Sequence, residues 1–391
     1  MNTPTAQRRY DLDWLRVGGI LTVFVYHTTR FFNNESWHIK NPTTYLAADI
    51  LETTLANWIL ALIFAISGAS LFFALGKGGA GRFIKDKVLR LGVPFVALGM
   101  ILFGAPQIYL ERLTHGEFSG SFVEFIPRYF QPGNFAWTGA HLWYLAMLFV
   151  FCLVFLPLLL WLKRGSGQRV MNRLGDLLAA RGALYGLALP TILCLSLTAA
   201  DSLVGETSWG GGSILSHATF FLSGFLIVSH EGLQRNIRRF RWLSLALVVI
   251  LLVTIFALLI AIGEPAPGTL LSALGRGLWG LWAWSWALAI LGFGLQRLDA
   301  STPLLTYANE AVLPFYILHQ PVLLAVGYFV VQWAIPAGLK FVVIDAIAFP
   351  IIMALYEFVV RRLNVLRLLF GMKPKQRGAA EARSVVTGQG A

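Results

Sequence analysis

Residues 8–32 read RRYDLDWLRVGGILTVFVYHTTRFF, an apolar run of membrane-spanning length that contains two ionisable side chains, Arg16 and His27. An ionisable residue within a membrane span costs at least a few kcal/mol and is a functional-site hypothesis by default. A separation of eleven residues on an α-helix returns to within about 20° of the same face and advances about 16.5 Å along the axis. Arg16 and His27 are therefore predicted to share one face of the first span, where they fit the two ends of an elongated ligand entering from the cytoplasm.

Simpler interpretations exist for each residue alone. Arg16 is within reach of the membrane interface, where a long side chain can extend its charge into water. His27 alone could be a hydrogen-bonded packing residue. Asp13 lies three residues before Arg16, on nearly the same face, and is expected to pair with it at the cytoplasmic end of the helix. The alignment of Arg16 with His27 favours the functional interpretation.

The composition identifies the class of protein. Of 391 residues, 57% are hydrophobic, 14% are aromatic and only 13% are charged, whereas a soluble protein has about 25% charged residues. The chain is therefore an integral membrane protein. Cys152 and Cys194 lie in apolar runs and are expected to be small buried hydrophobes. The first span has no following cleavage site and is expected to act as an uncleaved membrane signal. The sequence contains no Walker A loop and no zinc-binding Cys/His cluster, so no metal is expected.

Apolar runs of about 17–25 residues predict an all-α, polytopic membrane protein with about ten transmembrane helices. The expected spans are 14–32, 55–75, 88–110, 141–162, 183–200, 214–229, 242–262, 276–295, 311–331 and 339–360.

The distribution of basic residues supports this count. With a cytoplasmic N-terminus, the inner segments carry 24 of the 31 Lys and Arg residues and the outer segments carry six, as the positive-inside rule requires. Both termini are then cytoplasmic. The net charge of +12 follows from this topology, so the expected partners are membrane lipids with anionic headgroups rather than nucleic acid.

The chain is expected to form one membrane domain, residues 1–371, followed by a polar tail, 372–391, that is disordered in the cytoplasm. The longest outer loops are 33–54 and 111–140. The second is rich in aromatic residues and glycine and is expected to fold over the membrane domain.

A set of motifs spread over about residues 8–360 resembles the membrane-bound acyltransferase family 3. The pattern Arg16-x10-His27 resembles the signature of that family in its first span. The other matching stretches are FAISGASLFFAL (64–75), RFIKDKVLRLGVPF (82–95), PQIYLERL (106–113), GAHLWYLAMLF (139–149) and LPFYILHQP (313–321).

The resemblance implies that the chain moves an acyl group from a cytoplasmic carrier to an extracytoplasmic acceptor, commonly a sugar. WHIKNP (37–42), PQIYLER and HLWYL together are most similar to the glucan biosynthesis protein C branch, which is associated with succinylation of periplasmic glucans. The donor is then an acyl-CoA, either succinyl-CoA or acetyl-CoA. The acceptor is an extracytoplasmic glycan, and the location is the inner membrane of the cell.

The catalytic and donor-binding roles follow from the chemistry of this transfer. His27 is the candidate base for the acceptor hydroxyl, because a neutral imidazole can take up a proton and return it to the departing thiolate. A covalent acyl-histidine intermediate is an open alternative. Arg16, Lys87 and Arg90 are expected near the inner surface, where they would bind the phosphates of coenzyme A. Many family members have an Arg-x-x-Arg pair where this chain has Lys87 and Arg90. A lysine can still hold a phosphate as a point charge, but it lacks the bidentate fork of an arginine.

The ninth expected span contains Tyr316 and His319. His319 is expected near mid-membrane, one turn after Tyr316. The two residues either position the donor or the oxyanion, or they form a polar clamp between helices at the bend made by Pro321. Ser67 and Ser223, each followed by glycine, are better explained by close helix packing than by nucleophilic chemistry.

The acceptor side is expected to involve His141 and Trp143, at the outer mouth of the fourth span, and His38 of WHIKNP. Trp143 could equally be an interfacial anchor, and His141 could pair with a loop. Arg30, one turn beyond His27, is a candidate to hold the carboxylate of a succinyl group.

Two other functions remain open at this point. A secondary transporter could also have ten spans with a few ionisable residues, although the sequence shows no internal repeat. An acyltransferase could instead modify an exopolysaccharide, a lipid-linked sugar or a small metabolite. The oligomeric state is not predicted.

Overall fold

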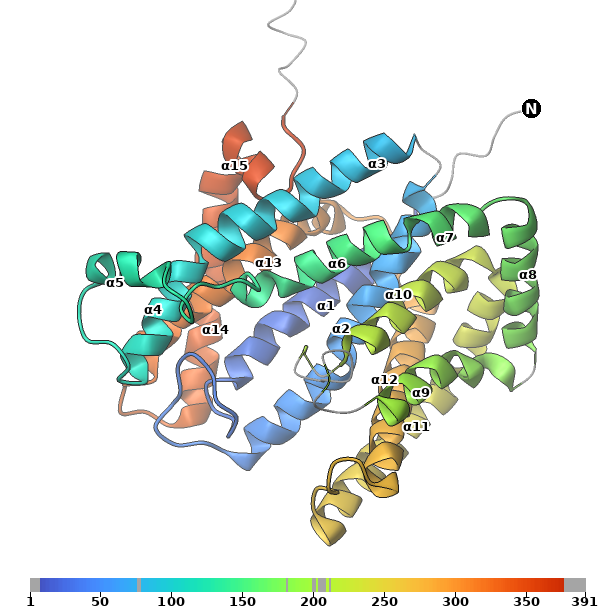
Figure 1. Ribbon diagram of the computed structural model, residues 1–391, viewed down its shortest axis with the longest axis horizontal. Helices are drawn as coiled ribbons and strands as arrows, with labels where there is room; N and C mark the ends of the chain where they lie inside the picture. The colour runs from blue at the N-terminus through green and yellow to red at the C-terminus, as the bar shows by residue number, and fades with distance from the viewer. Residues whose placement is uncertain are drawn as a thin grey trace, which may run out of the picture.

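The computed structural model describes residues 8–75, 79–180, 182–198, 202, 209–210 and 212–375, and it is all-helical over this part of the chain (Figure 1). The α-helices are α1 Tyr10–Thr29, α2 Leu46–Ala74, α3 Ala80–Lys87, α4 Gly104–Thr114, α5 Phe122–Tyr129, α6 Trp143–Val154, α7 Leu156–Leu162, α8 Gly165–Ala179, α9 Leu189–Leu197, α10 Ile214–Ser229, α11 Glu231–Ile262, α12 Leu270–Arg297, α13 Pro303–Val330, α14 Ala337–Ala354 and α15 Asn364–Leu369. Short π or 3-10 segments are η1 Val88–Gly92, η2 Phe95–Leu102, η3 Ala140–Leu142, η4 Ala183–Ala188 and η5 Leu355–Val360.

Six helical stretches are long and apolar enough to cross a membrane, so this is a multi-pass membrane protein. They are Leu46–Ala74, Ala80–Thr114, Glu231–Ile262, Leu270–Arg297, Pro303–Val330 and Ala337–Val360. A seventh exists if Ala140–Val154 and Leu156–Leu162, which are bent by 54°, form one broken span.

Three of the ten expected spans do not meet this test among the described residues. Ala183–Leu197 and Ile214–Ser229 are apolar but shorter than the roughly 20 residues that a bilayer requires. The helix α1 has 20 residues, and its first two turns carry Asp11, Asp13 and Arg16, which lower its hydropathy.

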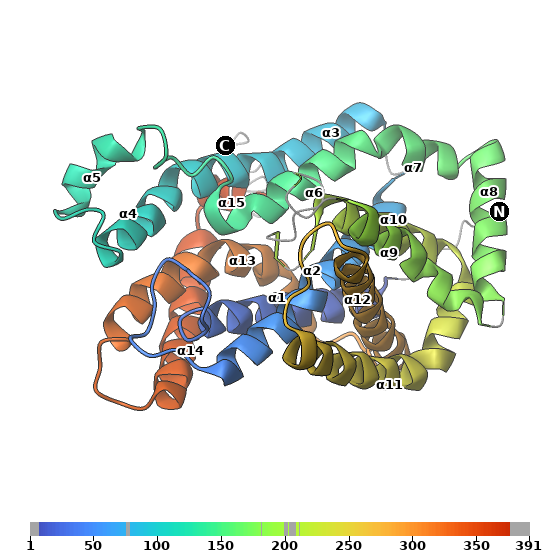
Figure 2. The same ribbon diagram turned by 60° about the horizontal axis from the view of Figure 1, so that its bottom comes forward.

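The helix α1 nevertheless lies in the middle of the bundle. It packs against α2, α12, α13 and α14 (Figure 1), and Ile20, Val23 and Phe24 are buried. The long pair α11 and α12 lies to one side (Figure 2). The helix α11 exposes apolar side chains such as Val253 and Ile260, as expected for a surface that faces lipid.

The helices α2 and α10 are in close contact, and the contact uses two glycines. A Cβ atom on Gly68 would lie 1.8 Å from the Phe221 carbonyl oxygen, and one on Gly224 would lie 1.8 Å from the Ala65 carbonyl oxygen. Small residues permit such close approach of backbones between membrane helices. The two Ser-Gly motifs therefore mark this contact, as their composition predicts.

Segments expected on the same side of the membrane contact one another. On the predicted inner side, Trp14 Nε1 donates to the Ala300 carbonyl at 3.1 Å, and Lys163 Nζ donates to the Leu75 carbonyl at 2.8 Å. On the predicted outer side, His115 Nε2 lies 3.0 Å from the Trp37 carbonyl oxygen.

The predicted outer loop after α4 and the start of the tail both pack against helices. Within the loop, Phe118, Phe125 and Tyr129 form a small cluster with Ala105 of α4, so the loop lies at the edge of the molecule near α4 (Figure 2). At the tail, the Lys373 carbonyl accepts a hydrogen bond from Arg367. Residues 372–375 therefore pack on the bundle, and 376–391 lie outside the described residues.

Candidate active site

Three histidines from separate parts of the chain meet inside the bundle. His27 comes from α1, His141 from η3 and His319 from α13. The ring centroids of His27 and His319 are 4.9 Å apart, and those of His141 and His319 are 5.1 Å apart. His141 and His319 are buried, with 5% and 1% exposure. The structure therefore brings together three residues that the sequence places in different spans.

Hydrogen bonds to backbone carbonyls define which nitrogens carry protons. His27 Nδ1 lies 2.9 Å from the Val23 carbonyl oxygen, and His319 Nδ1 lies 2.5 Å from the Tyr316 carbonyl oxygen. A carbonyl can only accept, so each Nδ1 carries a proton. In the neutral ring His319 Nε2 then carries a lone pair, and it lies 3.2 Å from His27 Nδ1. This assignment leaves the lone pair of His27 on Nε2.

A cavity of about 120 Å³ lies beside these rings, and we call it the outer cavity. Its lining residues are Val23, Tyr26, His27, Ala56, Ile59, Leu60, His141, Trp143, Tyr144, Gly210 and Tyr316. His141 Nε2 lies 3.0 Å from the Ile317 carbonyl oxygen, so its lone pair is on Nδ1, which is buried without a partner. In the neutral rings one lone pair is on His27 Nε2 and one is on His141 Nδ1, and both rings line this cavity.

A second cavity, of about 300 Å³, contains three basic side chains, and we call it the inner cavity. Arg16, Lys87 and Arg90 line it. Arg16 is held by Ser70 Oγ at 2.7 Å and by Asn309 Oδ1 at 3.2 Å. Arg90 lies in the π-helical segment η1, and such segments occur frequently at functional sites. The cation cluster is able to bind an anionic group such as a phosphate.

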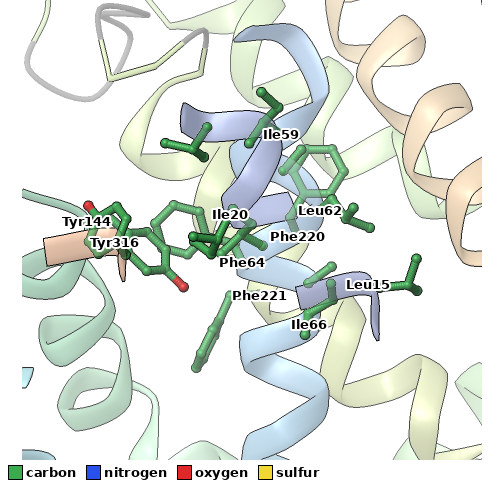
Figure 3. Packing of buried hydrophobic residues seen from close by; sticks show 14 of the residues in the cluster. Leu15, Ile20, Ile59, Leu62, Phe64, Ile66, Tyr144, Phe220, Phe221 and Tyr316 are labelled. Atoms are coloured by element: carbon green, nitrogen blue, oxygen red, sulfur yellow. The ribbon is translucent and has the colours of Figure 1, made fainter. Parts of the chain in front are cut away.

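Two tyrosines line both cavities. Tyr144 and Tyr316 have ring centroids 5.8 Å apart, and they lie side by side at the edge of the buried apolar cluster that includes Phe64 (Figure 3). The Tyr144 hydroxyl lies 2.8 Å from Ser67 Oγ, and the Tyr316 hydroxyl donates to the His141 carbonyl at 2.5 Å. These two rings therefore stand between the cation cluster and His27.

The remaining predicted site residues lie at different distances from the cavities. Trp143 lines the outer cavity. Asp13 pairs with Arg16 at 3.1 Å and with Arg8 at 3.0 Å, and it lines neither cavity. It therefore orients Arg16 from outside the cavity.

Arg30 and His38 also lie outside both cavities. Arg30 pairs with Glu35 and Glu52, so its charge is already neutralised by carboxylates. His38 pairs with Glu111, and its Nε2 lies 3.2 Å from Gln320 Nε2. The structure therefore connects the WHIKNP stretch to α13 directly after His319.

Sequence reasoning missed the contribution of Tyr144 and Ser67. Tyr144 belongs to the quoted HLWYL stretch but carries no charge, and Ser67 was explained by helix packing alone. Ser67 does lie beside the close α2–α10 contact, and its hydroxyl also reaches Tyr144. In the part of the chain that is described, no group of three or more His, Cys, Asp or Glu side chains is arranged to hold a metal ion.

The chain is similar to known proteins over almost its whole length. The chain is 23% identical to glucans biosynthesis protein C of Escherichia coli O139:H28 over 396 residues, covering 96% of this chain and 97% of that protein. It is 21% identical to the protein of the same name from Salmonella paratyphi A over 389 residues, covering 98% and 99%. No solved structure matches the chain. An acyltransferase-domain family model matches residues 9–357, and the chain therefore belongs to the acyltransferase 3 family.

Proposed function

We propose that this protein is an inner-membrane O-acyltransferase. It transfers a succinyl or acetyl group from cytoplasmic acyl-CoA to a hydroxyl of an extracytoplasmic carbohydrate, and a periplasmic glucan is the preferred candidate. The distant full-length similarity to glucans biosynthesis protein C supports the choice of acceptor class. In this proposal the chain crosses the membrane ten times, with both termini in the cytoplasm, and the inner cavity opens toward the cytoplasm.

One observation carries the proposal: a cation-lined cavity and a histidine-lined cavity meet at shared walls inside one bundle. Coenzyme A has its phosphates at one end and its thioester at the other end of a long, thin arm. Arg16, Lys87 and Arg90 would bind the phosphates, and the arm would bring the thioester to His27. Donor and acceptor would then meet inside the protein without either one crossing the membrane.

The acyl transfer follows from the state of His27. Its Nε2 lone pair takes the proton of the acceptor hydroxyl while the hydroxyl oxygen attacks the thioester carbonyl carbon. The tetrahedral intermediate collapses, the C–S bond breaks, and the thiolate receives the proton from His27 Nε2. The products are the carbohydrate ester and free coenzyme A. Initial attack by His27 Nε2 itself, through an acyl-histidine, has the same overall balance.

Two neighbouring residues assist His27. His319 Nε2 lies 3.2 Å from His27 Nδ1, and the Nδ1 proton is shared between His319 and the Val23 carbonyl oxygen. Holding that proton on Nδ1 leaves Nε2 as the base, so His319 is a positioning residue. The unpartnered Nδ1 of His141 is suited to accept a hydrogen bond from a second hydroxyl of the acceptor. Tyr316 holds the His141 backbone in place through its hydroxyl.

The direct test is release of free thiol by the purified protein in detergent. Acetyl-CoA and succinyl-CoA are supplied in turn, with and without a mixed glucan acceptor. We expect acceptor-dependent thiol release with one of the donors. In His27→Ala this release should fall by at least about 100-fold, the lower range for loss of a general base.

A matched control is His230→Asn. His230 lies outside both cavities, where it pairs with Asp176 and accepts from the Leu233 amide at the start of α11, and asparagine is also a good helix cap. We expect normal thiol release from this variant. Undiminished release from a well-folded His27→Ala variant would contradict the proposed mechanism. Absence of release and of coenzyme A binding in the wild type would contradict the proposed donor.

A further inference from the structure

Tyr144 lies at the boundary between the two cavities. It lines the inner cavity with the cations and the outer cavity with His27. Its ring is 5.8 Å from that of Tyr316, at an interplanar angle of 78°, so one ring presents its edge to the face of the other. A slender ligand that reaches from Arg16 to His27 must pass this pair.

The two tyrosines are not held in the same way. Tyr316 is fixed in α13, and its hydroxyl donates to a backbone carbonyl, that of His141, at 2.5 Å. Tyr144 lies one residue into α6, and its hydroxyl contacts a single side chain, Ser67 Oγ, at 2.8 Å. A hydroxyl–hydroxyl contact contributes only about 1 kcal/mol. Its ring also packs against Phe64, with the centroids 4.9 Å apart. Because its hydroxyl is held by a movable side chain and not by the backbone, Tyr144 is the easier of the two rings to displace.

We infer that Tyr144 is a positioning residue that closes the passage between the cavities in the empty protein and, when displaced, guides the thin arm of the donor along Tyr316 to His27. This inference rests on the proposed function, because it assumes that a thioester donor with its anionic group in the inner cavity is the substrate. It assigns a role to a residue that otherwise only completes the wall of both cavities.

The arrangement has a chemical consequence for the outer cavity. A closed ring keeps water of the inner cavity away from His27, so the base cannot activate water from that side. A linear thiol arm fits between two rings at this spacing only if Tyr144 rotates, and the vacated Ser67 hydroxyl then faces the arm. The Tyr144 side chain therefore both restricts the passage to a slender donor arm and limits hydrolysis of the thioester.

The experiment compares binding of two probes to the purified full-length protein. Coenzyme A carries the phosphates and the arm, whereas adenosine 3′,5′-bisphosphate carries phosphates without the arm. In the wild type we expect coenzyme A to bind at least about tenfold more tightly, because the arm adds contacts. Tyr144→Trp enlarges the ring and should abolish this difference, while the affinity for the bisphosphate is kept. Val150→Trp is the matched control, since Val150 is half exposed on the same helix and lines neither cavity.

Two further variants keep the inference testable if Tyr144→Trp fails to fold. Tyr144→Phe keeps the ring and loses only the contact with Ser67 that holds it in the closed position, so it should bind both probes and lower the KM for acyl-CoA about threefold. Tyr144→Ala opens the passage, so thiol release without any acceptor should increase at least about fivefold over Tyr144→Phe. These values are order-of-magnitude expectations from loss of one hydrogen bond and of water exclusion.

The outcomes separate this inference from the proposed function. If coenzyme A binds more tightly than the bisphosphate by the same factor in Tyr144→Trp and in the wild type, the inference is wrong and the acyltransferase proposal stands. The same holds if Tyr144→Ala and Tyr144→Phe hydrolyse acyl-CoA equally. If the wild type binds neither probe, the proposed donor itself is wrong.

Discussion

His319 Nε2 lies 3.2 Å from His27 Nδ1, and this contact joins α13 to α1 at the wall of the outer cavity. Each Nδ1 carries a proton, because each lies against a backbone carbonyl oxygen that can only accept. In the neutral ring the lone pair of His27 is therefore on Nε2. The contact also provides an acceptor for the Nδ1 proton when His27 becomes an imidazolium during the reaction.

His319→Ala should lower kcat by about 10- to 100-fold with little change in the KM for acyl-CoA. The reason is that loss of the Nε2 acceptor frees the His27 ring to rotate and removes support from its charged form. The measurement is the split between kcat and KM, from initial rates at varied acyl-CoA concentration. His319→Gln, which restores an acceptor, should recover part of kcat; equal losses of kcat in both variants would show that His319 only fills space.

Arg16→Ala should act on donor binding instead of on the chemical step. The guanidinium lines the inner cavity and is oriented by Ser70 and Asp13. Loss of one charge-assisted contact to phosphate corresponds to about 1.5–3 kcal/mol, or roughly a 10- to 100-fold higher KM for acyl-CoA. Initial rates at varied donor concentration provide the check.

The control for this prediction is Arg82→Ala, because Arg82 is exposed on α3 and lines neither cavity. It should leave the KM within about twofold, the scale expected of an exposed charge. A kcat loss in Arg16→Ala at unchanged KM would place Arg16 in the chemistry and would contradict donor binding.

Lys87→Arg should strengthen donor binding or leave it unchanged, whereas Lys87→Met should weaken it about tenfold. Lys87 and Arg90 both line the inner cavity, one turn apart. Arginine adds a bidentate fork that matches phosphate geometry, and methionine keeps the length but removes the charge. Titration with coenzyme A measures both. Tighter binding by the methionine variant would mean that no phosphate lies near this position.

Gly224→Ala should destabilise the protein by at least about 1–3 kcal/mol, because the added methyl group must displace backbone. A Cβ atom there would lie 1.8 Å from the Ala65 carbonyl oxygen of α2. Thermal unfolding in detergent and the yield of folded protein are the readouts. Gly18→Ala is the matched control, since a Cβ atom on Gly18 meets nothing within 4 Å. Equal melting temperatures for the two variants would show that α2 and α10 are not in close contact.

Much of the fold was accessible from the sequence, and the number of spans stays a prediction. The hydropathy of the long helices predicted a membrane protein, and six of the ten expected spans correspond to helices that pass by length and composition. The expected spans 183–200 and 214–229 correspond to shorter helices. Hydropathy alone does not reveal where a helix ends, because turns, caps and packing against neighbours decide that. Ten spans and the orientation of the termini remain predictions.

Part of the candidate site was likewise predictable from the sequence, and part was not. Periodicity placed Arg16 and His27 on one helix face, and the structure positions them at the inner and outer cavities. Arg30 was expected one turn further, near the acyl group, but Glu35 and Glu52 engage it away from the cavity. A partner that is distant in sequence cannot be recognised from the spacing on one helix.

The sequence by itself determined the class of protein and the alignment of Arg16 with His27, because composition and helical periodicity are local properties of the chain. Only the tertiary structure decided that His319, 292 residues away from His27, contacts it, and that Tyr144 lines both cavities. Helix periodicity fixes which face a side chain occupies, but the choice of neighbouring helices depends on the fit of side chains from the whole chain, such as Gly224 against Ala65.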